Sequence, residues 1–128
     1  MAGDFEPITH PKFRIWLRPD GIVQVIWAPR VAAVLEDAVA CVSATARVTG
    51  GRRSPVLVDM RDTGAQDRAT RAEWTHHNEV TAAVALIVGT PLSRMTGNLF
   101  VKIAKPPFPV RVFDQEASAV AWLRPFVG

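Results

Sequence analysis

The sequence has one cysteine, no tyrosine and no long hydrophobic run, and these shortages exclude several classes of protein. The single cysteine, Cys41, permits no internal disulfide and no cysteine-based zinc cluster, which favours a reducing compartment. The longest apolar stretch, residues 82–89, is far shorter than the ~20 residues that a membrane helix requires. The first residues lack the basic and apolar regions of a secretory signal. We therefore expect a cytoplasmic protein.

The chain also has no massed run of one charge sign. Its 128 residues carry 15 Lys and Arg against 12 Asp and Glu, a formal net charge of +3. Because these charges are interspersed, they indicate a slightly basic surface rather than a nucleic-acid-binding face. Hydrophobic residues make up 48% of the chain, as in ordinary globular domains. We expect an N-terminal arm over residues 1–10 and a single domain over residues 11–128.

The domain is expected to open with a β-hairpin. Residues 13–17 alternate between apolar and polar side chains, which is typical of a strand with one buried face. Pro19-Asp20-Gly21 favours a turn, since Pro pre-sets its own φ and Gly tolerates a positive one. Residues 22–27 then alternate again, which completes the hairpin signal.

Strands and helices alternate after the hairpin. Apolar residues at three-to-four spacing predict a helix over residues 31–48, ended by Gly50-Gly51. Apolar runs predict strands over residues 55–60, 82–88 and 109–113, and capping residues predict helices from Asp67 to about Glu79, from Thr90-Pro91 to before Lys105, and after Asp114. The order β-β-α-β-α-β-α-β-α predicts an α/β domain with a mixed, mostly parallel five-stranded sheet.

Two stretches carry a resemblance to a known family. They read PVLVDMRD and VALIVGTPLSRMTGNLFVKIAKPPFPVRVFDQEASAVAWL. The second is similar to a group of small actinobacterial SpoIIAA-like proteins of uncharacterised function, and the resemblance implies the STAS fold of anti-anti-sigma factors. The matching positions are Thr90, Pro91, Ser93, Arg94, Asn98, Pro106, Phe113, Asp114, Glu116, Ala121, Trp122 and Leu123.

The resemblance also raises the question of a phosphorylation switch. Anti-anti-sigma factors carry a Ser, in an Asp-Ser-Ser-Gly motif after the third strand, that a partner kinase phosphorylates. The residues at that place here are Asp67-Arg68-Ala69-Thr70, without a Ser, and Asp62-Thr63-Gly64 falls earlier, in the loop. The resemblance therefore implies a binding or regulatory module without the phospho-Ser switch. Thr63 and Thr70 are the remaining candidates for phosphorylation.

Four arginines fall at the expected carboxyl ends of two parallel strands. Arg61, Arg68 and Arg71 follow the strand over residues 55–60, and Arg94 begins the helix after the next strand. Ligands of open α/β sheets bind at such ends, and guanidinium groups hold phosphate or carboxylate bidentately. These arginines predict an edge that binds a small anionic ligand or a protein partner.

Asp59 and, from the family pattern, Asn98 complete the predicted ligand-binding set. An internal role is the alternative, because Asp59, Asp62 and Asp67 are close enough in sequence to pair with the same arginines. An enzyme acting on an anionic metabolite at this edge is the alternative to the binding module.

No motif predicts a reaction, a cofactor or a metal site. His76 and His77 are adjacent, so they point about 100° apart on a helix and do not share a metal as an i, i+4 pair does. Cys41 lies on an apolar stripe and is expected to be an inert thiol. The sequence contains neither a G-x-S-x-G turn nor a Gly-rich phosphate loop.

Two tryptophans of the hairpin are the last candidates. Trp16 lies on the polar side of the first strand and Trp27 ends the second. Exposed aromatic side chains beside an edge strand favour association, so one prediction is a homodimer through this hairpin. The other is that a further segment, such as residues 1–10, covers both tryptophans.

Overall fold

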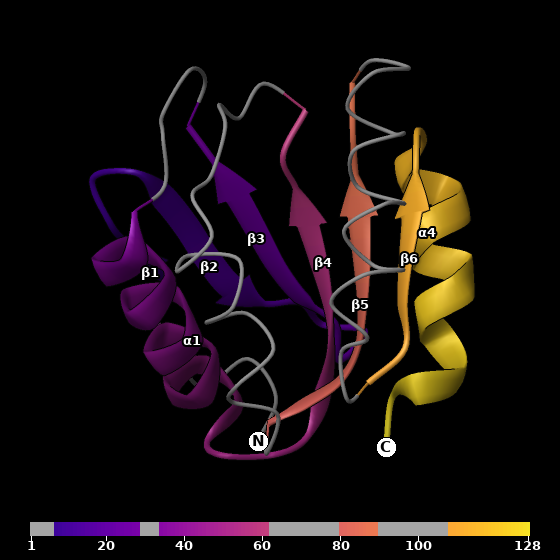
Figure 1. Ribbon diagram of the computed structural model, residues 1–128. Helices are drawn as coiled ribbons and strands as arrows, with labels where there is room; N and C mark the ends of the chain where they lie inside the picture. The colour runs from indigo at the N-terminus through magenta and orange to yellow at the C-terminus, as the bar shows by residue number, and fades with distance from the viewer. Residues whose placement is uncertain (1–6, 29–33, 62–79, 90–107) are drawn as a thin grey trace.

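The computed structural model describes residues 7–28, 34–61, 80–89 and 108–128. These residues form one six-stranded sheet in which every strand lies beside the strand that precedes it in sequence (Figure 1). The elements are β1 (Ile8–Thr9), β2 (Phe13–Leu17), β3 (Val23–Trp27), α1 (Leu35–Thr49), β4 (Ser54–Asp59), β5 (Thr81–Ile87), β6 (Val110–Phe113), α4 (Glu116–Leu123) and the 3-10 turn η1 (Arg124–Phe126).

The sheet confirms the predicted α/β class and the mixed, mostly parallel pairing. β1, β2 and β3 pair antiparallel, whereas β3, β4, β5 and β6 pair parallel. The strand count was predicted as five and is six, because Ile8 and Thr9 of the expected arm pair with Ile15 and Arg14. Two residues are too few for a periodic signal, so the sequence pattern did not reveal β1. The helices predicted from Asp67 and from Thr90-Pro91 lie outside the described residues.

The two helices lie on opposite faces of the sheet, and each covers its own hydrophobic cluster (Figure 1). Side chains alternate between the faces of a strand, so the central strand β4 contributes to both clusters, through Val56 on one face and Leu57 on the other. The α1 cluster contains Phe13, Ile15, Val23, Val25, Trp27, Cys41, Ala44, Val48 and Val56. The α4 cluster contains Ile22, Leu57, Ala83, Ala85, Ile87, Phe113, Ala119, Val120 and Leu123.

Helix α1 ends as predicted, with Gly50 in the left-handed conformation at φ 63°. The sequence pattern places Val31, Val34, Leu35, Ala38, Cys41, Val42 and Thr45 on one apolar stripe. Of these, Ala38, Cys41 and Thr45 are buried as predicted, whereas Val34 and Leu35 are exposed. The sequence of the helix carries apolar residues on two sides, and spacing alone does not tell which side meets the sheet. No helix in the described part of the chain is long and apolar enough to span a membrane.

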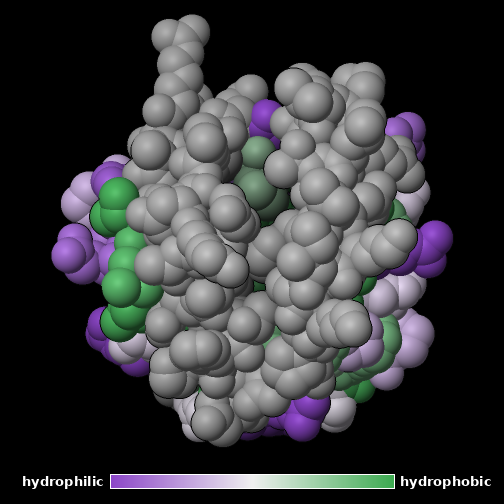
Figure 2. Space-filling view, viewed as in Figure 1, coloured by the Kyte–Doolittle hydropathy of each residue, from purple (hydrophilic) through white to green (hydrophobic). Residues whose placement is uncertain are grey.

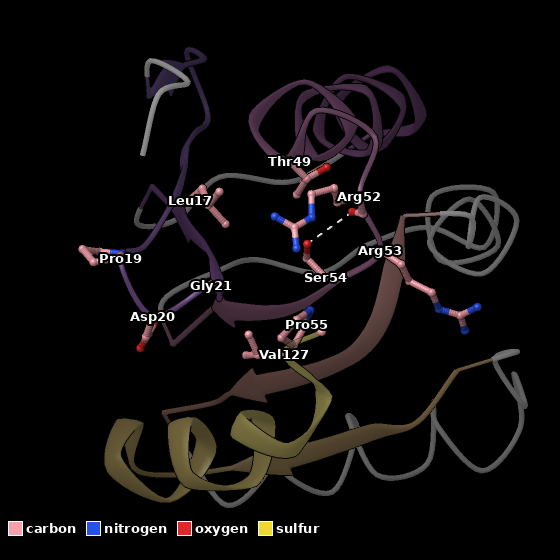
Figure 3. Close-up of a pocket in the computed structure, with 11 residues that line it drawn as sticks. Leu17, Pro19, Asp20, Gly21, Thr49, Arg52, Arg53, Ser54, Pro55 and Val127 are labelled. Carbon is pink, nitrogen blue, oxygen red and sulfur yellow. Dashed lines mark hydrogen bonds between the residues drawn. The ribbon is translucent and has the colours of Figure 1, made fainter. Parts of the chain in front are cut away.

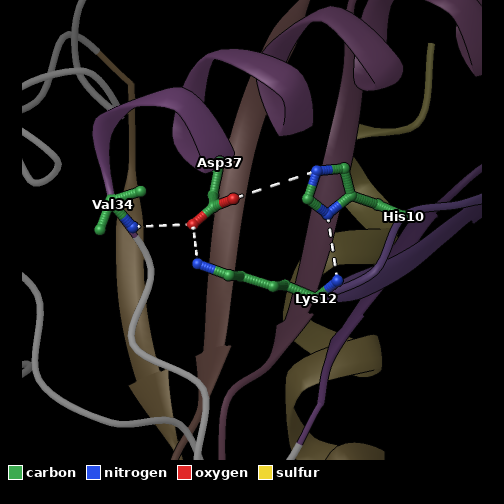
Figure 4. Close-up of polar contacts among 4 residues, drawn as sticks. All are labelled: His10, Lys12, Val34 and Asp37. Atoms are coloured by element: carbon green, nitrogen blue, oxygen red, sulfur yellow. Dashed lines mark hydrogen bonds and ion pairs between the residues drawn. The ribbon is translucent and has the colours of Figure 1, made fainter.

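A buried carboxylate joins the start of α1 to the turn between β1 and β2 (Figure 4). Lys12 Nζ donates to Asp37 Oδ2 at 2.7 Å, the backbone N–H of Val34 donates to the same oxygen at 2.9 Å, and His10 Nε2 lies 4.0 Å from Oδ1. Burial raises the pKa of Asp37, but these hydrogen bonds and positive charges outweigh it and hold the pKa below 3.8.

Candidate functional site

Asp59 and Arg61 form an ion pair at the carboxyl end of β4. Arg61 Nε donates to Asp59 Oδ1 at 3.0 Å, and Nη2 donates to Oδ2 at 2.6 Å. The side-chain hydrogen bond from Arg61 lowers the pKa of Asp59, partial burial opposes it, and the net shift is below the usual 3.8. The internal pairing that the sequence allowed is therefore present for this arginine. Arg68, Arg71, Arg94 and Asn98 lie outside the described residues.

The backbone of Arg61 lies close to Gly89, and this contact fixes the position of Arg61. A Cβ atom at Gly89, just past β5, would lie 2.8 Å from the carbonyl oxygen of Arg61. Backbone cannot yield as a flexible side chain can, so the position requires a residue without Cβ. The chain after β4 thus rests directly against the chain after β5.

The strand order does not mark a ligand crevice at these carboxyl ends. Open α/β sheets bind ligands where the strand order reverses. From β3 to β6 the order runs in one direction throughout. Between β3 and β6 the carboxyl edge therefore has no such reversal, and any binding there depends on individual side chains.

Three exposed or partly exposed side chains extend from this ion pair across β3 to β2. Ile26 is the register partner of both Asp59 on β4 and Arg14 on β2, and partners project from the same face. Trp16, two residues from Arg14, shares this face, which is the one opposite α1. Ile26 remains 39% exposed although α4 packs on β4, β5 and β6 of the same face. We call Arg14, Trp16, Ile26, Asp59 and Arg61 the β2–β4 surface.

The Arg14 guanidinium carbon lies 5.4 Å from the centre of the Trp16 ring, a cation–π contact. No carboxylate among the described residues pairs with Arg14. Gln24, the register partner of Trp16 on β3, is buried and accepts a hydrogen bond from Arg18 Nη1 at 3.3 Å. The β2–β4 surface thus carries a positive charge beside exposed apolar groups.

Trp27 does not belong to this surface, and the expectation that it is exposed was wrong. It is 5% exposed, lies in the α1 cluster and packs on the Phe13 ring at 5.0 Å between centroids. The alternation along β3 places Trp27 with Val23 and Val25, toward α1. The free edge expected beside the hairpin is also occupied, since β1 pairs with β2.

Residues 15–127 match a family described as a domain of unknown function, DUF7793. The chain belongs to this family. Its fold is similar to that of an uncharacterised DUF3478 protein with a SpoIIAA-like fold from Shewanella loihica PV-4, at 14% identity and a TM-score of 0.63, over 91% of this chain and 98% of that chain.

The predicted SpoIIAA-like fold is thereby confirmed. A protein of unknown function from Arthrobacter sp. FB24 is 27% identical over 85% of this chain and 96% of that chain, with a TM-score of 0.33. No curated protein sequence matches the chain.

A pocket of about 210 Å³ lies at the other end of this DUF7793 domain, beside the amino end of β4 (Figure 3). Arg52 reaches into it and Arg53 turns away (Figure 3). The hydroxyl groups are already used: Ser54 Oγ donates to the Arg52 carbonyl at 3.2 Å, and Thr49 Oγ1 donates to the Thr45 carbonyl at 2.9 Å. The carboxyl end of α1 is also nearby, and its dipole disfavours an anion.

The described residues assemble no metal or nucleophile site. No group of three His, Cys, Asp or Glu side chains in these segments is arranged to hold a metal ion. Burial raises the pKa of Cys41 to about 12, which agrees with the inert thiol expected from sequence. The β2–β4 surface is therefore the best-supported candidate for function in the described structure.

Sequence reasoning found Trp16, Asp59 and Arg61 but not Arg14 and Ile26. The period-two alternation could have indicated both residues. It places Arg14 on the same face of its strand as Trp16, and it places Ile26 on the face of its strand that does not carry Val25. The pairing of Ile26 with Asp59 depends on the parallel register between β3 and β4, which sequence does not specify. This register places Asp59 and Arg61, from the predicted ligand-binding set, on the same surface as Trp16, from the predicted interface.

Proposed function

We propose that this DUF7793 domain is a non-catalytic binding module that holds a protein partner on the β2–β4 surface, without a phospho-Ser switch. The proposal rests mainly on Arg14, whose guanidinium group contacts the Trp16 ring and pairs with no carboxylate of the described residues. The exposed Ile26 side chain lies beside it. Trp and Arg are the residues most enriched at the energetic centres of protein interfaces.

The shape of the surface favours a protein over a metabolite. Small molecules bind in concave pockets, whereas the β2–β4 surface is built from side chains standing on a sheet. Among the described residues of this surface, Asp59 and Arg61 neutralise each other, so Arg14 determines its net charge. The complementary partner is an acidic segment with an apolar side chain, which places a carboxylate on Arg14 and covers Ile26.

A peptide library displayed on phage tests this proposal. We expect selection on the wild-type domain to enrich acidic peptides with an apolar anchor, and these peptides to shift the amide NMR signals of Trp16 and Ile26. Arg14→Glu should weaken their binding at least about tenfold, because it places like charges together. Arg52→Glu, an exposed arginine at the opposite end of the sheet, is the matched control and should bind as the wild type does.

Three outcomes would contradict the proposal. The first is a library that yields no specific peptide, and the second is a set of peptides that bind Arg14→Glu equally well. The third is a small anion that stabilises the wild type in a thermal-shift screen of nucleotides and phosphorylated metabolites but fails on Arg61→Ala. That result would support the anionic-ligand function instead, and turnover of the same compound would support an enzyme.

A further inference from the structure

Helix α1 carries a second apolar stripe on an exposed flank, beside the face that packs on the sheet. Leu35 is 42% exposed and Val39 is 47% exposed, and with Val42 they follow the i, i+4, i+7 spacing of one helix face. In Figure 2 hydrophobic side chains form a patch on the left flank of the molecule, where α1 lies in Figure 1. This stripe extends along the helix to Ala46, eleven residues after Leu35.

Two opposite charges flank the stripe at its two ends. Glu36 lies in the first turn of α1 and Arg47 in the last, and both are exposed. Neither forms an ion pair with another described residue. They are eleven residues apart, about three helical turns, so they lie on the same flank of the stripe. The only other charged residue of α1, Asp37, is buried and paired with Lys12.

This arrangement is self-complementary in one orientation. When two identical helices pair antiparallel around a two-fold axis, residues on the same flank face each other with their order reversed. Glu36 of one copy then stands opposite Arg47 of the other, twice in each pair. In a parallel arrangement the two-fold axis runs along the helices and places the charged flanks of the two copies on opposite sides of the interface, so Glu36 and Arg47 would meet no opposite charge there.

We propose that two copies of this chain associate through α1 in an antiparallel pair, with Leu35, Val39 and Val42 at the centre and two Glu36–Arg47 ion pairs at the ends. The proposal is independent of the binding function assigned to the β2–β4 surface, which lies on the opposite face of the sheet. A helix of 15 residues is about 22 Å long, so the contact is small and the dimer is weak and concentration-dependent.

Sedimentation equilibrium from about ten micromolar to about one millimolar measures the association. Glu36→Arg and Arg47→Glu should each raise the dimer dissociation constant about tenfold or more, because each places like charges together. The double variant Glu36→Arg/Arg47→Glu should return the constant to within about threefold of wild type, since it restores both pairs in reverse. Within one copy the two residues are too far apart to interact, so this recovery reports a contact between copies.

Val39→Asp should leave the chain monomeric, and circular dichroism checks that each variant remains folded. Arg52→Glu is the charge-reversal control and should dimerise like the wild type. A wild-type chain that stays monomeric over the whole range overturns the proposal. So does a double variant that stays as weak as the single ones. Trp16→Arg distinguishes this interface from one through the hairpin: a dimer that dissociates in that variant also overturns it.

Discussion

Ile26 and Asp59 are register partners across the parallel strands β3 and β4, so an exposed apolar side chain stands beside the carboxylate that Arg61 holds. Neither residue is unusual by itself. Their adjacency joins the ion pair at the end of β4 to Arg14 and Trp16 on β2. One continuous surface results from residues that are up to 47 positions apart in sequence.

Arg61→Ala should raise the pKa of Asp59. In the wild type, hydrogen bonds from Arg61 hold this pKa below 3.8, and partial burial, which opposes them, remains in the variant. The pair is half-exposed, so the free energy of unfolding at neutral pH should fall by no more than about 1 kcal/mol. Carbon-detected NMR titration of the Asp59 carboxyl measures the pKa, and an unchanged titration would show that the ion pair does not persist in solution.

Asp37→Asn should destabilise the domain at neutral pH and weaken the dependence of its free energy of unfolding on acidic pH. The pKa of Asp37 is lower in the folded protein than the usual 3.8. The Asp37 carboxylate therefore contributes its full share of the free energy of unfolding above pH 3.8, and this share is lost as the pH falls from 3.8 to the folded-state pKa. We expect a loss of about 1–3 kcal/mol at pH 7, from the helix cap and the Lys12 pair. Urea unfolding between pH 2 and pH 7 checks both effects.

Lys12→Met provides the control for Asp37, because it removes the cation and leaves the carboxylate buried. The double variant should be destabilised by less than the sum of the single losses, as expected for two groups in direct contact. Strict additivity would contradict the geometry in Figure 4.

The two hairpin tryptophans should differ sharply in their effect on stability. Trp27→Ala removes a buried ring from the α1 cluster and should lower the free energy of unfolding by about 3–5 kcal/mol. Trp16→Ala removes a partly exposed ring and should lower it by about 1 kcal/mol or less. Urea denaturation of the two variants makes the comparison, and equal losses would contradict the assignment of the two side chains to opposite faces.

Gly89→Ala should disturb the β2–β4 surface through the backbone of Arg61. The added methyl group would meet the Arg61 carbonyl at 2.8 Å, so the chain after β4 must move. We expect a loss of about 1–3 kcal/mol and a shift of the Asp59 carboxyl titration toward that of Arg61→Ala. A variant with wild-type stability and titration would show that the close approach is not maintained.

Cys41 should resist alkylation in the folded protein. Its pKa of about 12 leaves almost no thiolate at pH 8, and its side chain is buried. Iodoacetamide labelling followed by mass spectrometry should be negligible in buffer and complete in denaturant. Fast labelling in buffer would indicate that α1 separates from the sheet.

The sequence alone predicted the parts of the fold that depend on local periodicity. The alternation over residues 13–17 and 22–27 defined the hairpin, and Gly50 marked the end of α1 within one residue. The two-residue strand β1 has no period to detect, so its pairing emerged only from the structure. Similarly, α1 has apolar residues on two sides, and only the position of the sheet shows that Leu35 faces outward.

The candidate site was harder to predict, because it depends on register. The carboxyl-end argument selected Asp59 and Arg61, and alternation selected Trp16. These residues share one surface through Ile26 only because of the register between β3 and β4. No local sequence pattern indicates that register, because the two strands are far apart in sequence. Asp37 was missed for a related reason: its partners Lys12 and His10 come from a different element.

The sequential strand order has a consequence for synthesis of the protein. Each strand pairs with the one translated just before it, so the sheet can grow strand by strand as the chain leaves the ribosome. The α1 cluster can close once β4 has emerged, because all of its buried residues precede Leu57. The α4 cluster cannot close until α4 has emerged, and until then Leu57, Ala83 and Ile87 lack the α4 side chains that pack on them. The nascent chain is therefore exposed to aggregation and to chaperones on this face of the sheet until α4 is synthesised.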